Sequence, residues 1–269
     1  MTTLITVLVV LVFAVLLYVF YRMQKRHAKF STRVYTALAI GIVFGGLLQL
    51  IFGVDNQVIS QSMEWINIVG EGYVGFLQML IMPLVFVSIV GAFTKMKVSE
   101  KLGKISATVL TSLLATTAIA ALIGIGTTIL FGLQGAKFTE GAAETARISE
   151  LATRQESIQG LTIPQQILSF IPKNVFADLA GTRATSTIGV VIFAAFVGIA
   201  YLGVKRKAPK EAEFFANLID SLYKIVMRIV TLVLRLTPYG VFALMTNVMA
   251  TSDFVAIINL GKFVLASYV

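Results

Sequence analysis

Apolar runs separated by short polar segments recur along the whole chain of 269 residues. A helix that crosses a membrane needs about 20 predominantly apolar residues. Runs near that length lie at 4–21, 34–52, 70–91, 105–131, 188–203 and 222–250. The pattern predicts an all-α, polytopic membrane protein. A last apolar run, 254–269, stops short of a full crossing, so we expect the sequence to be part of a longer polypeptide.

The segments between these runs differ in character. Residues 53–63 predict a short external loop, and 134–161 predict a longer polar external loop with mixed charge. Residues 162–187 contain two prolines, which favours short helices that lead into the next crossing. Residues 211–221 place two phenylalanines and a leucine on one side of a helix, a pattern typical of an interfacial amphipathic helix.

The composition agrees with a membrane protein, since 57% of the residues are hydrophobic, 13% are charged and the mean hydropathy is +0.89. Soluble domains carry about 25% charged residues. The net charge of +9 comes mainly from three basic clusters beside the ends of apolar runs. The clusters are Arg22, Lys25, Arg26, Lys29 and Arg33; Lys95, Lys97, Lys101 and Lys104; and Lys205, Arg206, Lys207 and Lys210.

The basic clusters indicate the topology, because Lys and Arg accumulate on cytoplasmic loops. We therefore expect a multi-pass protein of the plasma membrane with its N-terminus outside and its basic loops in the cytoplasm. Since topology accounts for the positive charges, no nucleic-acid partner is expected. The spans contain no nucleophile with a base, no HExxH motif and no carboxylate dyad, so we expect neither an enzyme nor a cofactor.

The run at 70–91, GEGYVGFLQMLIMPLVFVSIVG, is interrupted by Gly70, Glu71, Gln78 and Pro83. A proline in a helix interior removes one backbone hydrogen bond and costs about 3 kcal/mol in a soluble helix. In lipid, only neighbouring protein can make that loss tolerable. These residues indicate either an ordinary kinked span or a helix with specific protein contacts.

A shorter tract, RLTPYGVF at 235–242, repeats the order of a polar residue, apolar residues, a proline and a phenylalanine. By the predicted topology the run at 70–91 crosses inward and the run at 222–250 crosses outward. Inverted repeats in transporters leave this kind of weak internal sequence similarity. Arg235 and Pro238 are therefore candidate structural positions, and a charge as deep as Arg235 is expected to face protein or water.

At these residues the sequence resembles a known family. GEGYVGFLQMLIMP is similar to the signature of the dicarboxylate/amino acid:cation symporters, the glutamate transporter family, with Glu71, Gln78 and Pro83 in the key places. The leading proline of that signature is absent here. The tracts EKLGKISATVL, IPKNVFADLAG and RLTPYGVFALM resemble other family tracts in the same order, so the resemblance covers residues 31–269. Within the family, FSTRVYTALAIGI and RATSTIGVVIFAAFVGIAYLGVKRK are similar to the branch of bacterial L-cystine uptake proteins.

The resemblance implies the N-terminal, scaffold-rich half of an elevator-type, glutamate-transporter-like fold that assembles as a homotrimer. Residues 1–30 would form an extra N-terminal membrane helix and a basic loop. Residues 31–250 would supply scaffold spans and one Ser/Thr-rich span of the transport domain, and 251–269 would begin a further, truncated span. Gly70, Gln78 and Pro83 would then lie on a scaffold helix and shape helix contacts and a subunit interface.

The function implied by the resemblance is secondary transport: symport of L-cystine or a related amino acid with Na⁺ or H⁺. Thr116 and Thr117 align with a Thr-Ser pair that helps the family bind a cation, and hydroxyl oxygens suit a hard monovalent ion. Local hydrogen bonds to the preceding turn are the alternative for these hydroxyls. Substrate-binding residues are expected beyond Val269. The alternative function is a truncated scaffold or assembly unit with no transport activity of its own.

Overall fold

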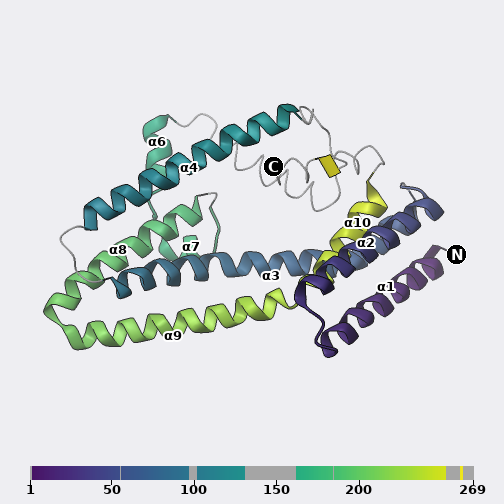
Figure 1. Ribbon diagram of the computed structural model, residues 1–269, viewed down its shortest axis with the longest axis horizontal. Helices are drawn as coiled ribbons and strands as arrows, with labels where there is room; N and C mark the ends of the chain where they lie inside the picture. Colours follow the sequence, from purple (N-terminus) through teal and green to yellow (C-terminus); the bar gives the residue numbers. More distant parts are fainter. Residues whose placement is uncertain are drawn as a thin grey trace. The chain divides into compact units, whose positions relative to one another are not determined.

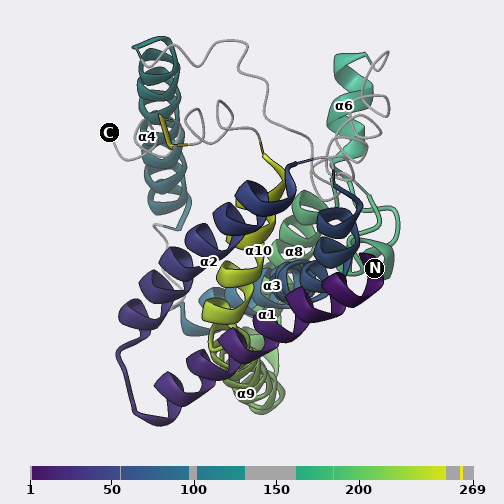
Figure 2. The same ribbon diagram turned by 90° about the vertical axis from the view of Figure 1, so that its right-hand side faces the viewer.

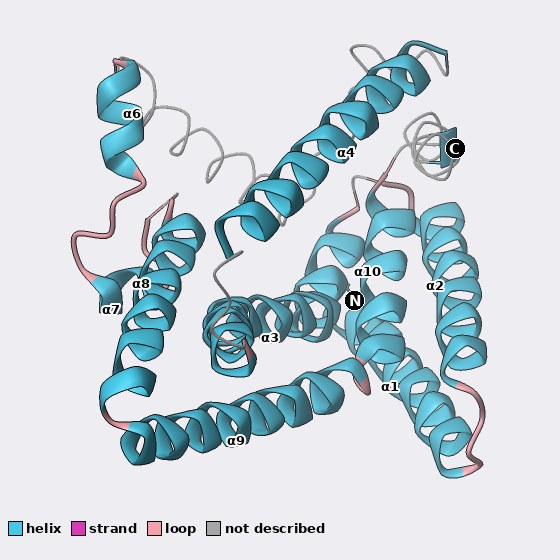
Figure 3. Ribbon diagram, turned by 60° about the vertical axis from the view of Figure 1, so that its left-hand side comes forward, coloured by secondary structure: helices cyan, strands magenta, loops and turns pink. Residues whose placement is uncertain are grey.

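The computed structural model describes residues 2–54, 56–96, 102–130, 162–183, 185–252 and 261–262. These residues form helices joined by loops, with no strand among them (Figure 3), which confirms the all-α prediction over this part. In chain order, with the labels of Figure 1, the helices are α1 (Thr2–Lys25), α2 (Phe30–Phe52), α3 (Gln57–Lys95), α4 (Leu102–Leu130), α6 (Ile163–Ser169), α7 (Val175–Leu179), α8 (Ser186–Lys207), α9 (Pro209–Leu234) and α10 (Thr237–Thr251).

Within this part, α1, α2, α3 and α8 are long and apolar enough to cross a membrane. The number of such spans rises from four to five if α9 and α10 together form one broken span. The prediction of a polytopic membrane protein therefore agrees with the helices. The polar loop predicted at 134–161 and most of the last run predicted at 254–269 lie outside the described residues.

The chain divides into two compact units. Unit 1 comprises Met1–Ile68, Val98–Glu144 and Val241–Val269, and unit 2 comprises Val69–Lys97 and Thr145–Gly240. Unit 1 therefore contains α1, α2 and α4, and unit 2 contains α6, α7, α8 and α9. Helices α3 and α10 each contribute residues to both units.

Unit 1 has an aromatic core around Phe242 of α10, whose side chain is fully buried. Phe13 of α1 stacks on Phe242 with 4.9 Å between the ring centroids, and Phe20 of α1 meets it edge-on at 5.2 Å. Phe44 of α2 lies 6.1 Å away from the same ring. Aromatic pairs of this kind contribute about 0.5–1.5 kcal/mol each beyond the buried area. They hold α1, α2 and α10 together, and Figure 2 shows these three helices side by side.

Two glycines of α2 allow close contact with α10. A Cβ added to Gly41 would lie 2.8 Å from Met245 Cβ, and one added to Gly45 would lie 2.7 Å from Met249 Cβ. Small residues four apart let two helix backbones approach in a membrane. One turn after Gly45, the side-chain amide of Gln49 donates a hydrogen bond to the carbonyl of Ser252 at 2.9 Å. This face of α2 is therefore a helix-packing face.

In unit 2, α8 and α9 pack against the C-terminal part of α3 (Figures 1 and 3). Val90 of α3, Ala194 of α8 and Ile219 of α9 form its buried core. Partly buried side chains surround this core: Phe86, Ile89, Val197 and Phe215. Gly198 of α8 lies directly against the Phe93 ring of α3, so a larger residue at that position would displace the ring.

The loop predicted at 53–63 is largely wrong, because α3 already begins at Gln57. Apolar side chains in and just after this segment recur on one face of the helix, which is the spacing of an amphipathic helix. The buried residues are Val58, Ile59, Met63 and Ile66. Interleaved polar residues masked this pattern in the sequence. Helix α3 is 39 residues long and runs through Pro83, so the proline does not end the helix.

The division predicted within 211–250 is also wrong. Helix α9 is continuous to Leu234, so no separate interfacial helix exists at 211–221, and the expected span from 222 is broken before α10. Pro238 favours the break, because it lacks the N–H that would bond to the Leu234 carbonyl. In the first turn of α10 that N–H is not needed. Arg235 therefore follows α9 as its C-cap and is exposed instead of lying inside one long span.

Candidate functional site

The candidate cation ligands Thr116 and Thr117 lie on α4, where both side chains are exposed. The hydroxyl of Thr116 donates a hydrogen bond to the carbonyl of Ser112, one turn earlier, at 3.0 Å. This is the local bond that the alternative interpretation expects, although a hydroxyl that donates its hydrogen can still offer lone pairs to a cation. Within the described part, no group of three or more Asp, Glu, His or Cys side chains could hold a metal ion.

The signature residues lie on different sides of α3. Gly70 is buried, whereas Glu71, Gln78 and Pro83 are exposed. The structure therefore does not gather these residues into one polar pocket. Glu71 and Gln78, seven residues apart, lie on one side of the helix, whereas Pro83, five residues after Gln78, lies on another.

The tract at 235–242 contacts the signature run at 70–91 through Tyr73. The hydroxyls of Tyr73 on α3 and Thr237 on α10 are 2.9 Å apart, and Gly240 lies directly against the Tyr73 ring. Pro238, between them, is fully buried. The start of α10 is thus packed on the signature segment of α3 within unit 2, while the exposed Arg235 takes no part in this contact.

A buried polar network surrounds Asp178 of α7, whose side chain is fully enclosed. Arg183 donates to both carboxylate oxygens of Asp178, from Nε at 2.8 Å and from Nη2 at 2.7 Å. The Ser186 hydroxyl donates to Oδ1 at 3.2 Å. Because Ser186 begins α8, the carboxylate also lies at the positive end of that helix dipole.

Local sequence features place the two charges together. The side chain of Asn174 caps α7 by accepting hydrogen bonds from the backbone N–H groups of Phe176 and Ala177. Gly181 has a φ of +72°, which favours glycine, and it turns the chain between Asp178 and Arg183. Arg183 Nη1 then donates to the carbonyl of Ser169 at 3.2 Å. The network therefore fastens the end of α6, α7 and the start of α8 to one another.

The electrostatics favour a pair that is charged at neutral pH. The hydrogen bonds from the Arg183 guanidinium hold the pKa of Asp178 below its ordinary value of 3.8, although burial acts in the opposite direction. The carboxylate in turn raises the pKa of Arg183. A carboxylate whose oxygens accept three hydrogen bonds is suited to holding helices and not to exchanging protons near neutral pH.

The sequence interpretation missed this network. Its only signals were one Asp and one Arg, five residues apart, in a tract that leads into an apolar span. That separation is not the i,i+4 spacing of a helical ion pair. The contact depends on the turn at Gly181, which the pattern alone did not indicate.

Comparison with known proteins decides the family. A model of the sodium:dicarboxylate symporter family matches residues 30–269. The chain belongs to this family. The resemblance drawn from the signature tract is thereby confirmed, and with it the glutamate-transporter-like membrane fold.

Relatives of the chain include L-cystine uptake proteins called TcyP. The chain is 53% identical to that of Bacillus licheniformis over 266 residues, which cover 99% of this chain and 58% of that protein. The chain is 53% identical to the TcyP protein of Bacillus subtilis over 268 residues, which cover 100% of this chain and 58% of that protein. It is 54% identical to that of Shouchella clausii over 266 residues, or 99% and 57%.

The chain therefore spans less than two thirds of the length of these relatives. The match to the symporter family begins at residue 30, so α1 precedes it, whereas the alignments with the TcyP proteins extend over nearly the whole chain. Because these relatives are transport proteins, the prediction that the chain is not an enzyme is confirmed.

Proposed function

We propose that this protein takes up L-cystine, or a related amino acid, by symport with Na⁺ or H⁺ across the plasma membrane. The observation that carries the proposal is an identity of 53–54% to L-cystine uptake proteins along nearly the whole chain. The active form includes the part of those relatives that this chain does not cover, and we place the substrate-binding residues there. The N-terminus lies outside and the basic loops lie in the cytoplasm.

The spans within residues 31–250 supply the scaffold of this transporter, apart from the Ser/Thr-rich helix α4, which belongs to the transport domain. The scaffold assembles as a homotrimer. On α3, the exposed residues Glu71, Gly72, Gly75 and Gln78 form a stripe, here called the α3 stripe. A Cβ added to either glycine would meet nothing within 4 Å. An ionisable residue is costly in lipid and small residues favour helix–helix contact, so the stripe is better covered by a second copy of the chain than by acyl chains.

Thr116 and Thr117 contribute hydroxyl oxygens to the coupling-cation site. Their support is the resemblance, together with the exposure of both side chains on α4. The remaining ligands come from the part of the protein outside this chain.

Uptake of radiolabelled L-cystine into proteoliposomes tests the function. The full-length protein is reconstituted and given an inward Na⁺ gradient, an inward H⁺ gradient, both gradients or neither. We expect one gradient to accelerate uptake and to drive accumulation above the external concentration. Uptake that is unchanged when both gradients are collapsed would exclude symport. If another amino acid accumulated and L-cystine did not, the proposed substrate would be wrong and the symport mechanism would stand.

The cation site is tested by Thr116→Ala and Thr117→Ala, with Thr128→Ala as the matched control. Thr128 lies on the same helix, is exposed, and also donates to a carbonyl four residues earlier, that of Gly124 at 2.7 Å. We expect the concentration of the coupling cation at half-maximal uptake to rise about tenfold for the first two variants, since each 1.4 kcal/mol of lost binding is a factor of ten. Equal effects at all three positions would favour the local hydrogen-bond interpretation.

The subunit contact is tested by Gly75→Leu on the α3 stripe. Gly203→Leu on α8 is the control, because a Cβ there also meets nothing within 4 Å. We expect native mass spectrometry to show the trimer for the control and a loss of trimer for Gly75→Leu. A trimer that survives Gly75→Leu would place the interface elsewhere.

A further inference from the structure

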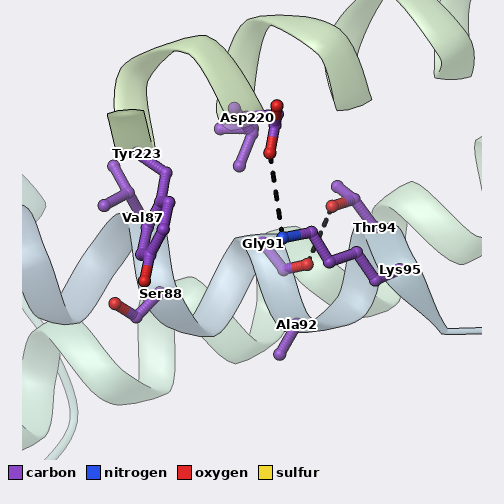
Figure 4. Close-up of a pocket in the computed structure, with 9 residues that line it drawn as sticks. Val87, Ser88, Gly91, Ala92, Thr94, Lys95, Asp220 and Tyr223 are labelled. Carbon is purple, nitrogen blue, oxygen red and sulfur yellow. Dashed lines mark hydrogen bonds and ion pairs between the residues drawn. The ribbon is translucent and has the colours of Figure 1, made fainter. Parts of the chain in front are cut away.

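A pocket of about 210 Å³ lies between α3 and α9 in unit 2 (Figure 4). Its polar lining includes Ser88, Thr94 and Lys95 of α3 and Asp220 of α9, and its apolar lining includes Val87 and Ile219. One water takes about 30 Å³ of liquid volume, so the pocket is large enough for a phosphate group with a few waters.

Lys95 and Asp220 line the pocket, and Lys224, which is paired with Asp220 beside the lining, makes the local charge positive. Lys95 Nζ lies 3.7 Å from Asp220 Oδ1, and Lys224 Nζ lies 2.8 Å from Asp220 Oδ2, so two ammonium groups face one carboxylate. Both lysine side chains are mostly exposed, at 69% and 75%. An ammonium group has three N–H donors, so each lysine can contact a further anion while it stays near Asp220.

The surroundings strengthen the positive field. Lys205, near the end of α8, donates a hydrogen bond to the carbonyl of Met96, the residue that follows α3, at 3.4 Å. The basic end of α8, which also carries Arg206 and Lys207, therefore meets the end of α3 close to Lys95. By the positive-inside rule this end of unit 2 faces the cytoplasm. Basic pockets between membrane helices on that side suit anionic lipid headgroups.

Apolar side chains along α9 are placed to meet hydrocarbon. On α9, Met227 and Leu234 follow Asp220 by seven and fourteen residues, which places them on the same side of the helix as Asp220, and both are exposed. A lipid whose phosphate enters the pocket could thus lay its chains along exposed apolar surface of the same helix. A soluble phosphate would gain nothing from these residues.

We propose that the pocket between α3 and α9 binds the phosphate of an anionic phospholipid from the cytoplasmic leaflet, held by Lys95 and Lys224. Asp220 opposes the lipid phosphate and keeps the two lysines in place when the pocket is vacant. The proposal concerns lipid recognition by the scaffold and is independent of the transported substrate.

The test uses the full-length protein purified with bound lipid and reconstituted in phosphatidylcholine with or without phosphatidylglycerol. The variant Lys95→Gln/Lys224→Gln removes the lysine that lines the pocket and the lysine that is paired with Asp220 beside it. The control Lys25→Gln/Lys29→Gln removes the same charge from two exposed lysines of the first basic cluster, neither of which lines the pocket. Native mass spectrometry measures retained phosphatidylglycerol, and thermal unfolding in each lipid measures its stabilising effect.

We expect the pocket variant to retain about tenfold less phosphatidylglycerol than the control and to lose the rise in Tm that this lipid gives, since each lysine near a charged surface contributes substantially to anionic-lipid attraction. Lys95→Arg/Lys224→Arg should restore both readouts. An equal loss in the pocket variant and the control, or no loss in either, would overturn the proposal. A Tm rise produced by inorganic phosphate in phosphatidylcholine would overturn the assignment to a lipid.

The variant Asp220→Asn should change lipid retention in the opposite direction from the lysine variant. Removing the carboxylate removes repulsion of the phosphate, so retention of phosphatidylglycerol should increase. Glu213→Gln on the same helix is the control with an equal change in charge. If the Lys95–Asp220–Lys224 cluster were only a structural bridge, Asp220→Asn would reduce stability and leave lipid retention no higher than in the control.

Discussion

Two aspartates of unit 2 are each paired with cations, and their surroundings are opposite. Asp178 is fully buried and accepts hydrogen bonds from two fixed side chains, one of which is the bidentate guanidinium of Arg183. Asp220 has a side chain that is 38% exposed and faces two lysines that are 69% and 75% exposed. In the first pair, here called the enclosed pair, the carboxylate is fully enclosed and Arg183 is 30% exposed. The second pair is open to solvent and lipid.

The difference shows what decides whether an ion pair is structural or available to a ligand. Arginine presents a planar fork that matches a carboxylate, and here its third nitrogen is fixed to a backbone carbonyl. Lysine is a flexible point charge, and exposed lysine pairs contribute little to stability. We therefore assign the Asp178 network to holding α6, α7 and α8 together, and the Asp220 cluster to binding.

The largest expected effect comes from breaking the enclosed pair. Asp178→Ala leaves the Arg183 guanidinium without its carboxylate. Losing one partner of a fully buried pair costs about 3–5 kcal/mol, which is an upper bound here because the Arg183 side chain is 30% exposed. We expect a large fall in the thermal unfolding midpoint of the protein in detergent. Asp220→Ala, the comparison variant on α9, should change the midpoint little because its partners are exposed.

A double variant shows whether the loss comes from the uncompensated charge. Asp178→Ala/Arg183→Met removes both charges, and it should recover part of the midpoint lost in Asp178→Ala. Equal midpoints for Asp178→Ala and Asp220→Ala would remove the distinction between the two pairs.

The second-largest loss of stability is expected when the space beside Asp178 and Arg183 is filled. A Cβ added to Gly189 of α8 would lie 2.8 Å from Asp178 Oδ2 and 3.3 Å from Arg183 Nη2. Gly189→Ala should therefore displace the pair and cost about 1–3 kcal/mol, as overpacking does. Gly203→Ala on the same helix has open space around its new Cβ and should be neutral or stabilising by about 0.5–1 kcal/mol. A Gly189→Ala protein as stable as Gly203→Ala would mean that the network tolerates rearrangement.

Sequence reasoning succeeded where a pattern repeats along the chain and failed where a contact depends on one turn. The apolar runs predicted the membrane helices because burial in lipid demands a long apolar segment. The signature around Glu71, Gln78 and Pro83 led to the correct family. The network at Asp178 was missed because its members come together only through the turn at Gly181.

Helix boundaries show the same limit. The start of α3 was missed because polar residues interrupt its buried side chains, and the break before α10 was missed although Pro238 was noticed. A proline can lie within a continuous helix, as Pro83 does, or in the first turn of a new one, as Pro238 does. Packing decides between these outcomes, and a single sequence does not specify the packing.

A smaller effect is expected from the cap that positions Asp178. Asn174 Oδ1 accepts hydrogen bonds from Phe176 N at 3.0 Å and Ala177 N at 3.3 Å. Replacing an N-cap Asn with Ala costs about 1 kcal/mol. We expect Asn174→Ala to lower the thermal midpoint modestly and Asn174→Asp to preserve it. A loss as large as that of Asp178→Ala would show that α7 unfolds without its cap.

Lowering the pH from neutral should have the smallest effect of these changes. The direction of the effect follows from the pKa of Asp178. The folded-state pKa lies below the ordinary value of 3.8, so the folded protein binds a proton at Asp178 less readily than the unfolded chain does. The pair therefore contributes its full stability at pH values above 3.8 and loses that contribution as the pH falls through the lower, folded-state pKa. We expect the difference in thermal midpoint between the wild type and Asp178→Asn to stay constant from neutral pH down to about that ordinary pKa and to shrink below it. A difference that already shrinks well above 3.8 would mean that Arg183 does not hold Asp178 in its charged form, and the contrast between the enclosed pair and the open pair would then be lost.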